Sequence, residues 1–184
     1  MNSIQKKFDI ISKYDQTAKH YDKRYNSIQN LKFNLIFQKI KKFKTDIILD
    51  LGCGTGLLFN LLKNRADLLV GMDISKKMLE IALISKKSNY LHLICADAEF
   101  LPFRNNIFST IFSITVLQNL PNPVISINEV SRVCKKGGFT IFTALKKDLE
   151  LKQFENMFNR TNLKEILTWN MHETEDFATI RKKI

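Results

Sequence analysis

The stretch ILDLGCGTG, residues 48–56, places three of the six glycines of this chain within five residues, directly after an apolar run. Glycine loses much conformational freedom on folding, so such a cluster is expected where the backbone needs a positive φ or where another group must approach the main chain. The apolar pair Leu57 and Leu58 follows, and a helix is expected to begin at Leu57. A strand, a glycine turn and a helix in this order predict a ligand site at the carboxyl edge of a sheet.

Outward from this stretch, apolar runs alternate with helical segments. The runs DIILDL, DLLVGMD, YLHLICAD, IFSTIFSITVL and GFTIFTAL are too continuously apolar for half-exposed strands, so they indicate strands that are covered on both faces. Helical segments are expected at residues 57–64, 75–86, 123–134 and 149–159. The alternation predicts an α/β fold: a doubly wound, Rossmann-like sheet, mostly parallel, with helices on both faces.

The two ends of the chain depart from this alternation. Residues 163–171 and 176–181 read as two strands that are joined by the short turn HETE, so we expect an antiparallel hairpin that completes the sheet and the fold by residue 184. Apolar residues at helical spacing predict an amphipathic helix over residues 27–42, with a shorter helix over residues 17–24 before it. We expect a single domain over residues 1–184.

The chain carries 29 Lys and Arg residues against 18 Asp and Glu residues, a net charge of +11. This charge suits a polyanion such as RNA, because Lys and Arg make phosphate contacts. Most of these residues are lysines that recur in pairs along the whole chain, which favours solvated faces over one nucleic-acid surface. RNA binding is therefore kept as the weaker alternative.

The sequence lacks the features of a secreted or membrane protein. Its N-terminus has no uninterrupted apolar stretch like that of a signal peptide, and its longest apolar run is far shorter than the roughly 20 residues of a membrane span. Cys53, Cys95 and Cys134 are widely spaced and form no CxxC motif, so neither a disulfide framework nor a zinc site is indicated. We expect a cytoplasmic protein with reduced thiols, no membrane contact and no metal.

Three carboxylates are expected at the same sheet edge as the glycine loop. Asp50 precedes the loop, Asp73 ends the second strand and Asp97 ends the third. No basic residue lies near the loop in the sequence, so the crevice should disfavour a pyrophosphate and favour a nucleoside that carries positive charge. The loop also lacks the GxxxxGK[ST] pattern of a P-loop, and its third glycine comes one position too early for the GxGxxG dinucleotide pattern.

The chain resembles the class I S-adenosylmethionine-dependent methyltransferases, in the broad group that includes the quinone-biosynthesis enzymes. Five segments carry the resemblance in order: ILDLGCGTG, VGMDISKKMLEIA, ADAEFLPF, FSITVLQNLPNP and EVSRVCKKGGFTIFT. It implies S-adenosyl-L-methionine as cofactor, S-adenosyl-L-homocysteine as product, a helical lid on the substrate side over residues 1–43 and a cofactor-binding core over residues 44–184. The cofactor-binding residues that it implies are Asp50, Gly52, Gly54, Gly56, Asp73, Ile74, Asp97, Ala98 and Thr115.

The resemblance also implies a role for most of these residues. The glycines would cradle the methionine part of the cofactor, and Asp50 would help to hold its ammonium group. Asp73 would hold the ribose, Ile74 would flank the adenine, and Asp97 with Ala98 would read the adenine edge.

Two residues are candidates for work at the transferred methyl group. The segment TAKHYDKRY resembles the family's A..YD signature, which implies that Tyr21 lies beside the methyl. Asn119 stands where related sequences often carry a histidine, so the obvious general base is absent; His20 is a weak substitute that we expect on the surface. In-line methyl transfer mainly needs a nucleophile that is held close and desolvated, so a strong base is not required.

The third strand, residues 90–95, lies at a sheet edge in the family's strand order and reads YLHLIC, without a charge or a proline to protect it. Unprotected apolar edges invite another strand. Several family members that modify tRNA, ribosomes or release factors bind a small zinc-containing activator protein along this edge. The resemblance therefore implies such a partner in a heterodimer; the alternative is a monomer whose edge is covered by a loop, or a second copy.

Two classes of function remain. One is methyl transfer to a nitrogen or oxygen acceptor, either in the translation machinery (tRNA, rRNA or protein) or in a small metabolite. The other is a cofactor-binding partner subunit without turnover, which the missing histidine makes conceivable. A dehydrogenase is a distant third reading, which NAD binding would reveal.

Overall fold

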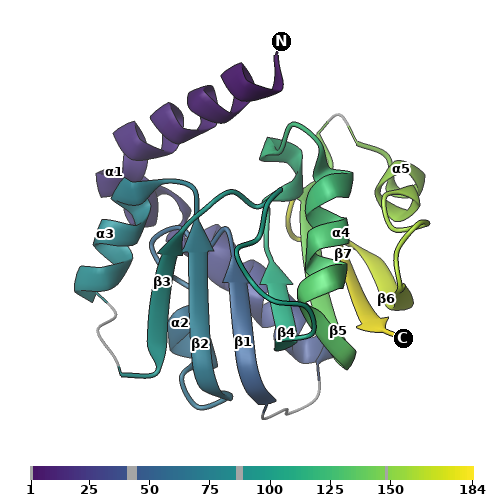
Figure 1. Ribbon diagram of the computed structural model, residues 1–184. Coiled ribbons are helices and arrows are strands. Elements are labelled where there is room, and N and C mark those ends of the chain that lie inside the picture. The colour runs from purple at the N-terminus through teal and green to yellow at the C-terminus, as the bar shows by residue number, and fades with distance from the viewer. Residues whose placement is uncertain (1, 41–44, 86–88, 148) are drawn as a thin grey trace.

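The computed structural model describes residues 2–40, 45–85, 89–147 and 149–184, in which helices surround one seven-stranded sheet (Figure 1). The helices are α1 (Ser3–Lys39), α2 (Phe59–Leu62), α3 (Lys76–Ser85), α4 (Pro123–Val133) and α5 (Leu151–Asn156), with a 3-10 turn, η1, at Leu117–Asn119. The strands are β1 (Thr45–Leu51), β2 (Ala66–Asp73), β3 (Leu91–Cys95), β4 (Phe108–Ser113), β5 (Cys134–Leu145), β6 (Leu163–Met171) and β7 (Asp176–Lys183).

The strand order is β3-β2-β1-β4-β5-β7-β6. Strands β1 to β5 pair in parallel, whereas β7 pairs antiparallel with both β5 and β6. The predicted mostly parallel sheet with a C-terminal antiparallel hairpin is therefore confirmed. The hairpin joins the sheet through β7, so β6 and β3 are the two outer strands, and the edge position that was expected for β3 is also confirmed.

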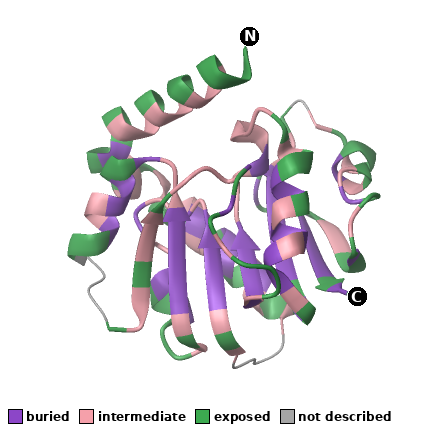
Figure 2. Ribbon diagram, viewed as in Figure 1, coloured by how far each residue is buried: buried purple, intermediate pink, exposed green. Residues whose placement is uncertain are grey.

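Two apolar layers hold the helices on opposite faces of the sheet. Successive residues of a strand point to opposite faces, and β1 follows this rule. Ile48 packs in the layer that contains Phe33 of α1 and Leu62 of α2, whereas Leu49 packs in the layer that contains Ile127 of α4. Figure 2 shows that the central strands are buried along most of their length, which explains their continuous apolar sequences.

The helices after the first strand are shorter than predicted. The helix expected over residues 57–64 is only the four residues of α2, because turn hydrogen bonds continue as far as Phe59, whose N–H donates to the Gly56 carbonyl at 3.1 Å. The helices expected over 123–134 and 149–159 shorten to α4 and α5, and Cys134 already begins β5. The predicted end of another helix at Lys86 lies outside the described residues.

The prediction of two separate N-terminal helices is wrong, because α1 is one helix of 37 residues. The sequence from Ser3 to Lys39 contains no glycine or proline, so nothing interrupts the backbone ladder. Residues such as Asn26 and Ser27 favour helix starts, but here they lie within the helix. The end predicted at Lys42 lies outside the described residues. A helix of this length spans about 55 Å, so its two halves contact different parts of the molecule.

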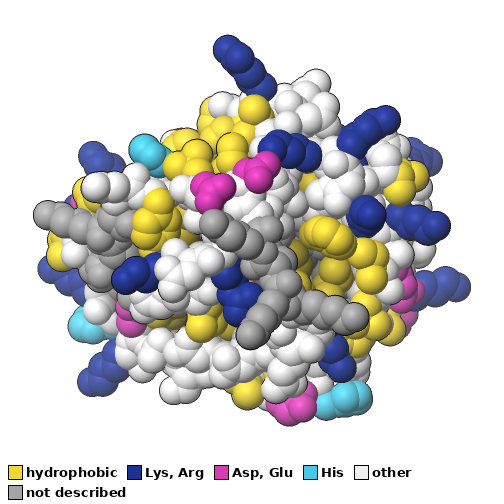
Figure 3. Space-filling view, turned by 90° about the horizontal axis from the view of Figure 1, so that it is seen from below, with side chains coloured by type: hydrophobic (Ala, Val, Ile, Leu, Met, Phe, Trp, Pro, Cys, Tyr) yellow, Lys and Arg dark blue, Asp and Glu magenta, His cyan; other side chains and the backbone are white. Residues whose placement is uncertain are grey.

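Lys and Arg side chains are spread around the face in Figure 3 and are separated by apolar and uncharged surface. On this face the charge does not gather into one patch, in agreement with the interpretation of the lysine pairs as solvated positions. Within the described part of the chain, no helix combines the length and the apolar character needed to cross a membrane.

Candidate active site

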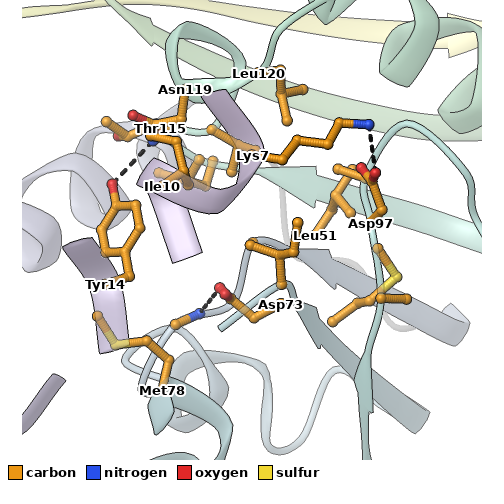
Figure 4. A pocket seen from close by; sticks show the side chains of 18 of the residues that line it. Lys7, Ile10, Tyr14, Leu51, Asp73, Met78, Asp97, Thr115, Asn119 and Leu120 are labelled. Carbon is orange, nitrogen blue, oxygen red and sulfur yellow. Dashed lines mark hydrogen bonds and ion pairs between the residues drawn. The ribbon is translucent and has the colours of Figure 1, made fainter. Parts of the chain in front are cut away.

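One pocket brings most of the predicted residues together at the carboxyl edge of the sheet (Figure 4). The carboxyl ends of the four parallel strands β1, β2, β3 and β4 meet there, and the first half of α1 lies across them. The predicted residues that line it are Tyr21, Gly52, Gly54, Asp73, Ile74, Asp97, Ala98, Thr115 and Asn119. Asp50 lies in an adjoining small cavity that shares Tyr21, Gly52 and Gly54 with the pocket.

The glycine loop leaves room for a ligand at one position. Gly54 has a φ of +54°, and a Cβ atom added there would meet no atom within 4 Å. The pocket therefore reaches the backbone of Gly54 directly. Gly56 has a φ of +79° but does not line the pocket; an added Cβ would lie 2.5 Å from the ring of Phe59. Its glycine character is thus explained by the turn into α2, whether or not it also contacts a ligand.

Asp73 joins the loop to the second strand. Its Oδ2 accepts a hydrogen bond from the Gly54 N–H at 2.8 Å, and its Oδ1 accepts one from the Ser75 N–H at 2.8 Å. Burial raises the pKa of this carboxyl group above its usual value, and the backbone N–H groups of Ser75, Gly54 and Ile74 act in the opposite direction. Each oxygen keeps a further lone pair for a hydroxyl group in the pocket.

Asp50 is a buried acid beside the glycine loop. Its exposed fraction is 3%, and burial together with the neighbouring charge of Asp73 raises the pKa of Asp50 to about 8. The acid is therefore largely protonated near neutral pH. A cation placed beside it would restore the ionised form, because an opposite charge compensates for the lost hydration.

Asp97 meets a lysine that sequence reasoning missed. Lys7, on the first turns of α1, places its Nζ 2.6 Å from Asp97 Oδ2 and 2.5 Å from Glu99 Oε2. Figure 4 shows Lys7 reaching Asp97 across the mouth of the pocket. No basic residue was expected near the glycine loop, and Lys7 compensates Asp97 rather than the acids beside the loop; the crevice as a whole is nevertheless not free of basic residues. Lys7 lies 90 residues from Asp97 in the chain, and no local pattern links the two positions.

The two predicted catalytic residues lie on the same side of the pocket. Asn119 Nδ2 donates to Tyr14 Oη at 3.0 Å, and the ring of Tyr14 lies 6.3 Å from that of Tyr21. Burial raises the pKa of both tyrosines above the usual value. Both phenols therefore stay protonated near neutral pH, so neither acts as a base. His20 is exposed on α1, as expected.

Thr115 completes this wall in an unusual conformation. Its φ is +61°, which a β-branched residue adopts only when its surroundings impose it. The Thr115 N–H donates to Thr143 Oγ1 at 2.8 Å, and Lys32 Nζ donates to Thr115 Oγ1 at 2.9 Å. The Thr115 position could be suggested by its place after the fourth strand, but its partners on α1 and β5 could not.

The matches to known proteins agree with this architecture. A family model described as "Methyltransferase domain" matches residues 49–142. An uncharacterized protein of Methanocaldococcus jannaschii, MJ1252, is 40% identical over 140 residues, which are 76% of this chain and 53% of that protein. A malonyl-[acyl-carrier protein] O-methyltransferase of Marinomonas sp. is 29% identical over 150 residues, 79% of this chain and 54% of that enzyme. The chain thus spans about half the length of the curated relatives that it matches.

Solved structures match the fold over nearly the whole chain. One is the complex between the Haloferax volcanii Trm112 methyltransferase activator and a methyltransferase, with a TM-score of 0.75 and 14% identity. The match covers 92% of this chain and 97% of that one. At this identity the match supports the fold alone.

Proposed function

Because this chain belongs to the S-adenosylmethionine-dependent methyltransferases, we propose that it binds S-adenosylmethionine between the glycine loop and α1 and catalyses methyl transfer to a nitrogen or oxygen atom. One observation carries the proposal: the pocket is open at the backbone of Gly54 and is lined by the carboxyl groups of Asp73 and Asp97, and the carboxyl group of Asp50 lines the small cavity that adjoins it. These groups suit a cofactor that carries an ammonium, a sulfonium, a ribose and an adenine.

The carboxylates and the open backbone of the site fit the parts of this cofactor. Asp50, whose pKa is raised to about 8, needs a cation to stay ionised near neutral pH, and an amino-acid ammonium supplies one. Asp73 has free lone pairs for the two hydroxyls of a ribose. Asp97 and Ala98 lie further along the edge, where the adenine would lie, with Ile74 beside its ring. Gly52, Gly54 and Thr115 would border the methionine part.

When bound, the cofactor supplies an electrophilic methyl carbon: the lone pair of the acceptor forms the new bond, and the sulfur keeps the electrons of the broken one as a neutral thioether. The side chains of this protein then have to orient the acceptor and exclude water. Tyr21 and Asn119 face the junction between the cofactor pocket and a second chamber, where the acceptor would lie. Because both tyrosines of this wall stay protonated, neither takes the proton of the acceptor, which passes to water once the methyl group has been transferred.

A second observation favours a protein partner at β3. Alternate backbone groups of this edge strand bond to β2: the Tyr90 carbonyl accepts from the Leu69 N–H at 2.8 Å, and the Ala96 N–H donates to the Asp73 carbonyl at 3.1 Å. The groups of Leu91, Leu93 and Cys95 therefore face the open edge. We propose that a small activator protein adds a strand here. An active monomer of the isolated chain at micromolar concentration would contradict this proposal.

Titration calorimetry tests the proposed function. We expect S-adenosylmethionine and S-adenosylhomocysteine to bind the purified chain, and Asp73→Asn to weaken both by about tenfold or more, because a hydrogen bond to a charged group contributes about 1.5–3 kcal/mol. Asp46→Asn, at the far and exposed end of β1, is the matched control and should bind like the parent chain. Binding of NAD instead of these ligands would reject the proposal.

Turnover separates the two remaining classes of function. An enzyme converts bound S-adenosylmethionine to S-adenosylhomocysteine when an acceptor is supplied, whereas a partner subunit only binds it.

We infer a cytoplasmic location from the three free thiols of Cys53, Cys95 and Cys134.

A further inference from the structure

A second chamber lies directly behind the cofactor pocket. It has a volume of about 530 Å³, within the usual range for sites that enclose small molecules. Tyr14, Tyr21, Thr115 and Asn119 line both cavities and therefore form the wall between them. A molecule in this chamber would lie against the two residues that are assigned to the transferred methyl group.

The inner end of the chamber is built from buried polar groups. Lys32 and Asp176, whose side chains are 4% and 0% exposed, form an ion pair of 2.7 Å. Lys32 also donates to Thr115 Oγ1, and so holds the strained residue of the shared wall. A buried ion pair is costly to desolvate and is weak evidence for stability alone. Its position at the inner end of a chamber, next to a strained residue, points to a site with a function.

One hydrogen-bond acceptor in the chamber wall has no partner. Gln118 donates from Nε2 to the Thr115 carbonyl at 2.6 Å, which fixes the direction of its side chain. Its Oε1 is buried and, among the described residues, receives no hydrogen bond. A buried acceptor without a partner costs free energy, so a small shift of this side chain that opens Oε1 to the chamber would let an O–H or N–H group of a bound molecule satisfy it.

The mouth of the chamber is aromatic and positively charged. Lys13 Nζ lies 5.5 Å from the centre of the Tyr14 ring, and Arg24 Cζ lies 5.2 Å from the centre of the Tyr25 ring. Both cations are exposed, whereas Glu175 is the one exposed acid among the described residues that line the chamber. Tyrosine rings offer flat surfaces for stacking, and the two cations favour an anionic group at the opening.

We propose that this chamber binds the methyl acceptor, and that the acceptor is a small planar molecule with an O–H or N–H donor at one end and a carboxylate or phosphate at the other. The donor faces Gln118, the flat body lies among the tyrosines, and the anion faces Lys13 and Arg24. The volume of the chamber suits a small molecule. This inference rests on the proposed methyltransferase function.

The test uses the full chain saturated with S-adenosylhomocysteine and ligand-observed NMR. The probes are 4-hydroxybenzoate, phenyl phosphate and the neutral 4-hydroxybenzamide. We expect at least one anion to bind roughly threefold to tenfold more tightly than the amide, which is the range for partly exposed charge pairs. The probe that binds more tightly shows whether the anionic group of the acceptor is a carboxylate or a phosphate.

Two variants locate the probe. Arg24→Gln and Lys13→Gln should each reduce the preference for the anion, whereas Lys23→Gln, an exposed neighbour that does not line the chamber, should keep it. The proposal is overturned if neither anion binds better than the amide, or if the preference survives both variants. It is also overturned if a single-stranded RNA oligonucleotide binds in an Arg24-dependent manner and the anions do not compete. Failure to bind S-adenosylhomocysteine would instead reject the proposed function itself.

Discussion

Asp50 is the single residue whose charge the fold disturbs most clearly. It lies at the end of β1, 3% exposed, and its pKa of about 8 is far above that of an acid in water because of burial and the charge of Asp73. An acid with a raised pKa binds its proton more tightly in the folded than in the unfolded chain. Its contribution to stability is therefore present at low pH and is lost as the pH rises from about 4 to about 8.

This shift leads to a prediction for Asp50→Asn. Without cofactor, the variant should gain stability relative to the parent chain as the pH rises, so the difference in Tm should increase by several degrees between pH 5 and pH 9. For a chain of this length, about 1 kcal/mol corresponds to about 2–4 °C. Thermal unfolding across this pH range measures the effect. Asp46→Asn is the control, because its exposed pair with Lys135 contributes little. A difference that stays constant with pH would contradict the assigned pKa.

The same substitution should strongly weaken cofactor binding, because a neutral amide oxygen accepts a hydrogen bond from an ammonium group but lacks the attraction between opposite charges. Asp50 would then lower the stability of the cofactor-free protein and contribute only when the cofactor is bound. Such a cost is expected at functional sites.

Among the elements, α1 has the largest effect on the site. Its first half crosses the carboxyl edge of the sheet, and several polar contacts hold it there. Lys7 pairs with Asp97 and Glu99, and Asp15 Oδ1 accepts a hydrogen bond from Ser75 Oγ at 2.6 Å. Its second half packs Phe33 into the apolar layer on one face of the sheet. The first half therefore depends on polar contacts, whereas the second half is held by apolar packing and by the buried ion pair of Lys32.

We expect Lys7→Met to loosen only the first half of α1. Hydrogen exchange of backbone amides in residues 3–14 should become several-fold faster in the cofactor-free chain, since Lys7 pairs with the partly exposed Asp97 and with the buried Glu99, and the two ion pairs together contribute about 1 kcal/mol or more. Residues 27–39 should keep the protection of the parent chain. Lys19→Met, an exposed position on the same helix, should leave both regions unchanged. Equal exchange in Lys7→Met and in the parent would show that these ion pairs do not hold the helix.

At the scale of the whole molecule, the ion pair between Lys32 and Asp176 joins the N-terminal helix to the C-terminal hairpin. Because both side chains are buried, removing one partner leaves an uncompensated charge in the interior. Lys32→Met and Asp176→Asn should each lower the free energy of unfolding by about 3 kcal/mol or more. The combined variant should lose less than the sum of the two. Urea unfolding of the four chains measures the coupling, and full additivity would contradict a direct ion pair.

The order of strand, turn and helix was predicted well because each of these elements has a recognisable pattern within its own stretch of sequence. The continuous apolar runs of β1 and β2 identified buried parallel strands, and the turn between β6 and β7 was too short for anything but an antiparallel pair. The N-terminal helix was predicted less well. Residues 3–16 carry a weak apolar pattern, since much of their inner face is polar and contacts the site rather than a core.

The sequence by itself determined the sheet, the glycine loop and the carboxylates of Asp50, Asp73 and Asp97, because parallel topology brings all strand ends to one edge whatever lies elsewhere. Only the tertiary structure decided that Lys7 meets Asp97 and that Lys32 meets Thr115. These partners are 90 and 83 residues apart in the chain. Their meeting depends on where a long helix crosses the sheet, and that follows from packing across the whole molecule, which no local period or motif encodes.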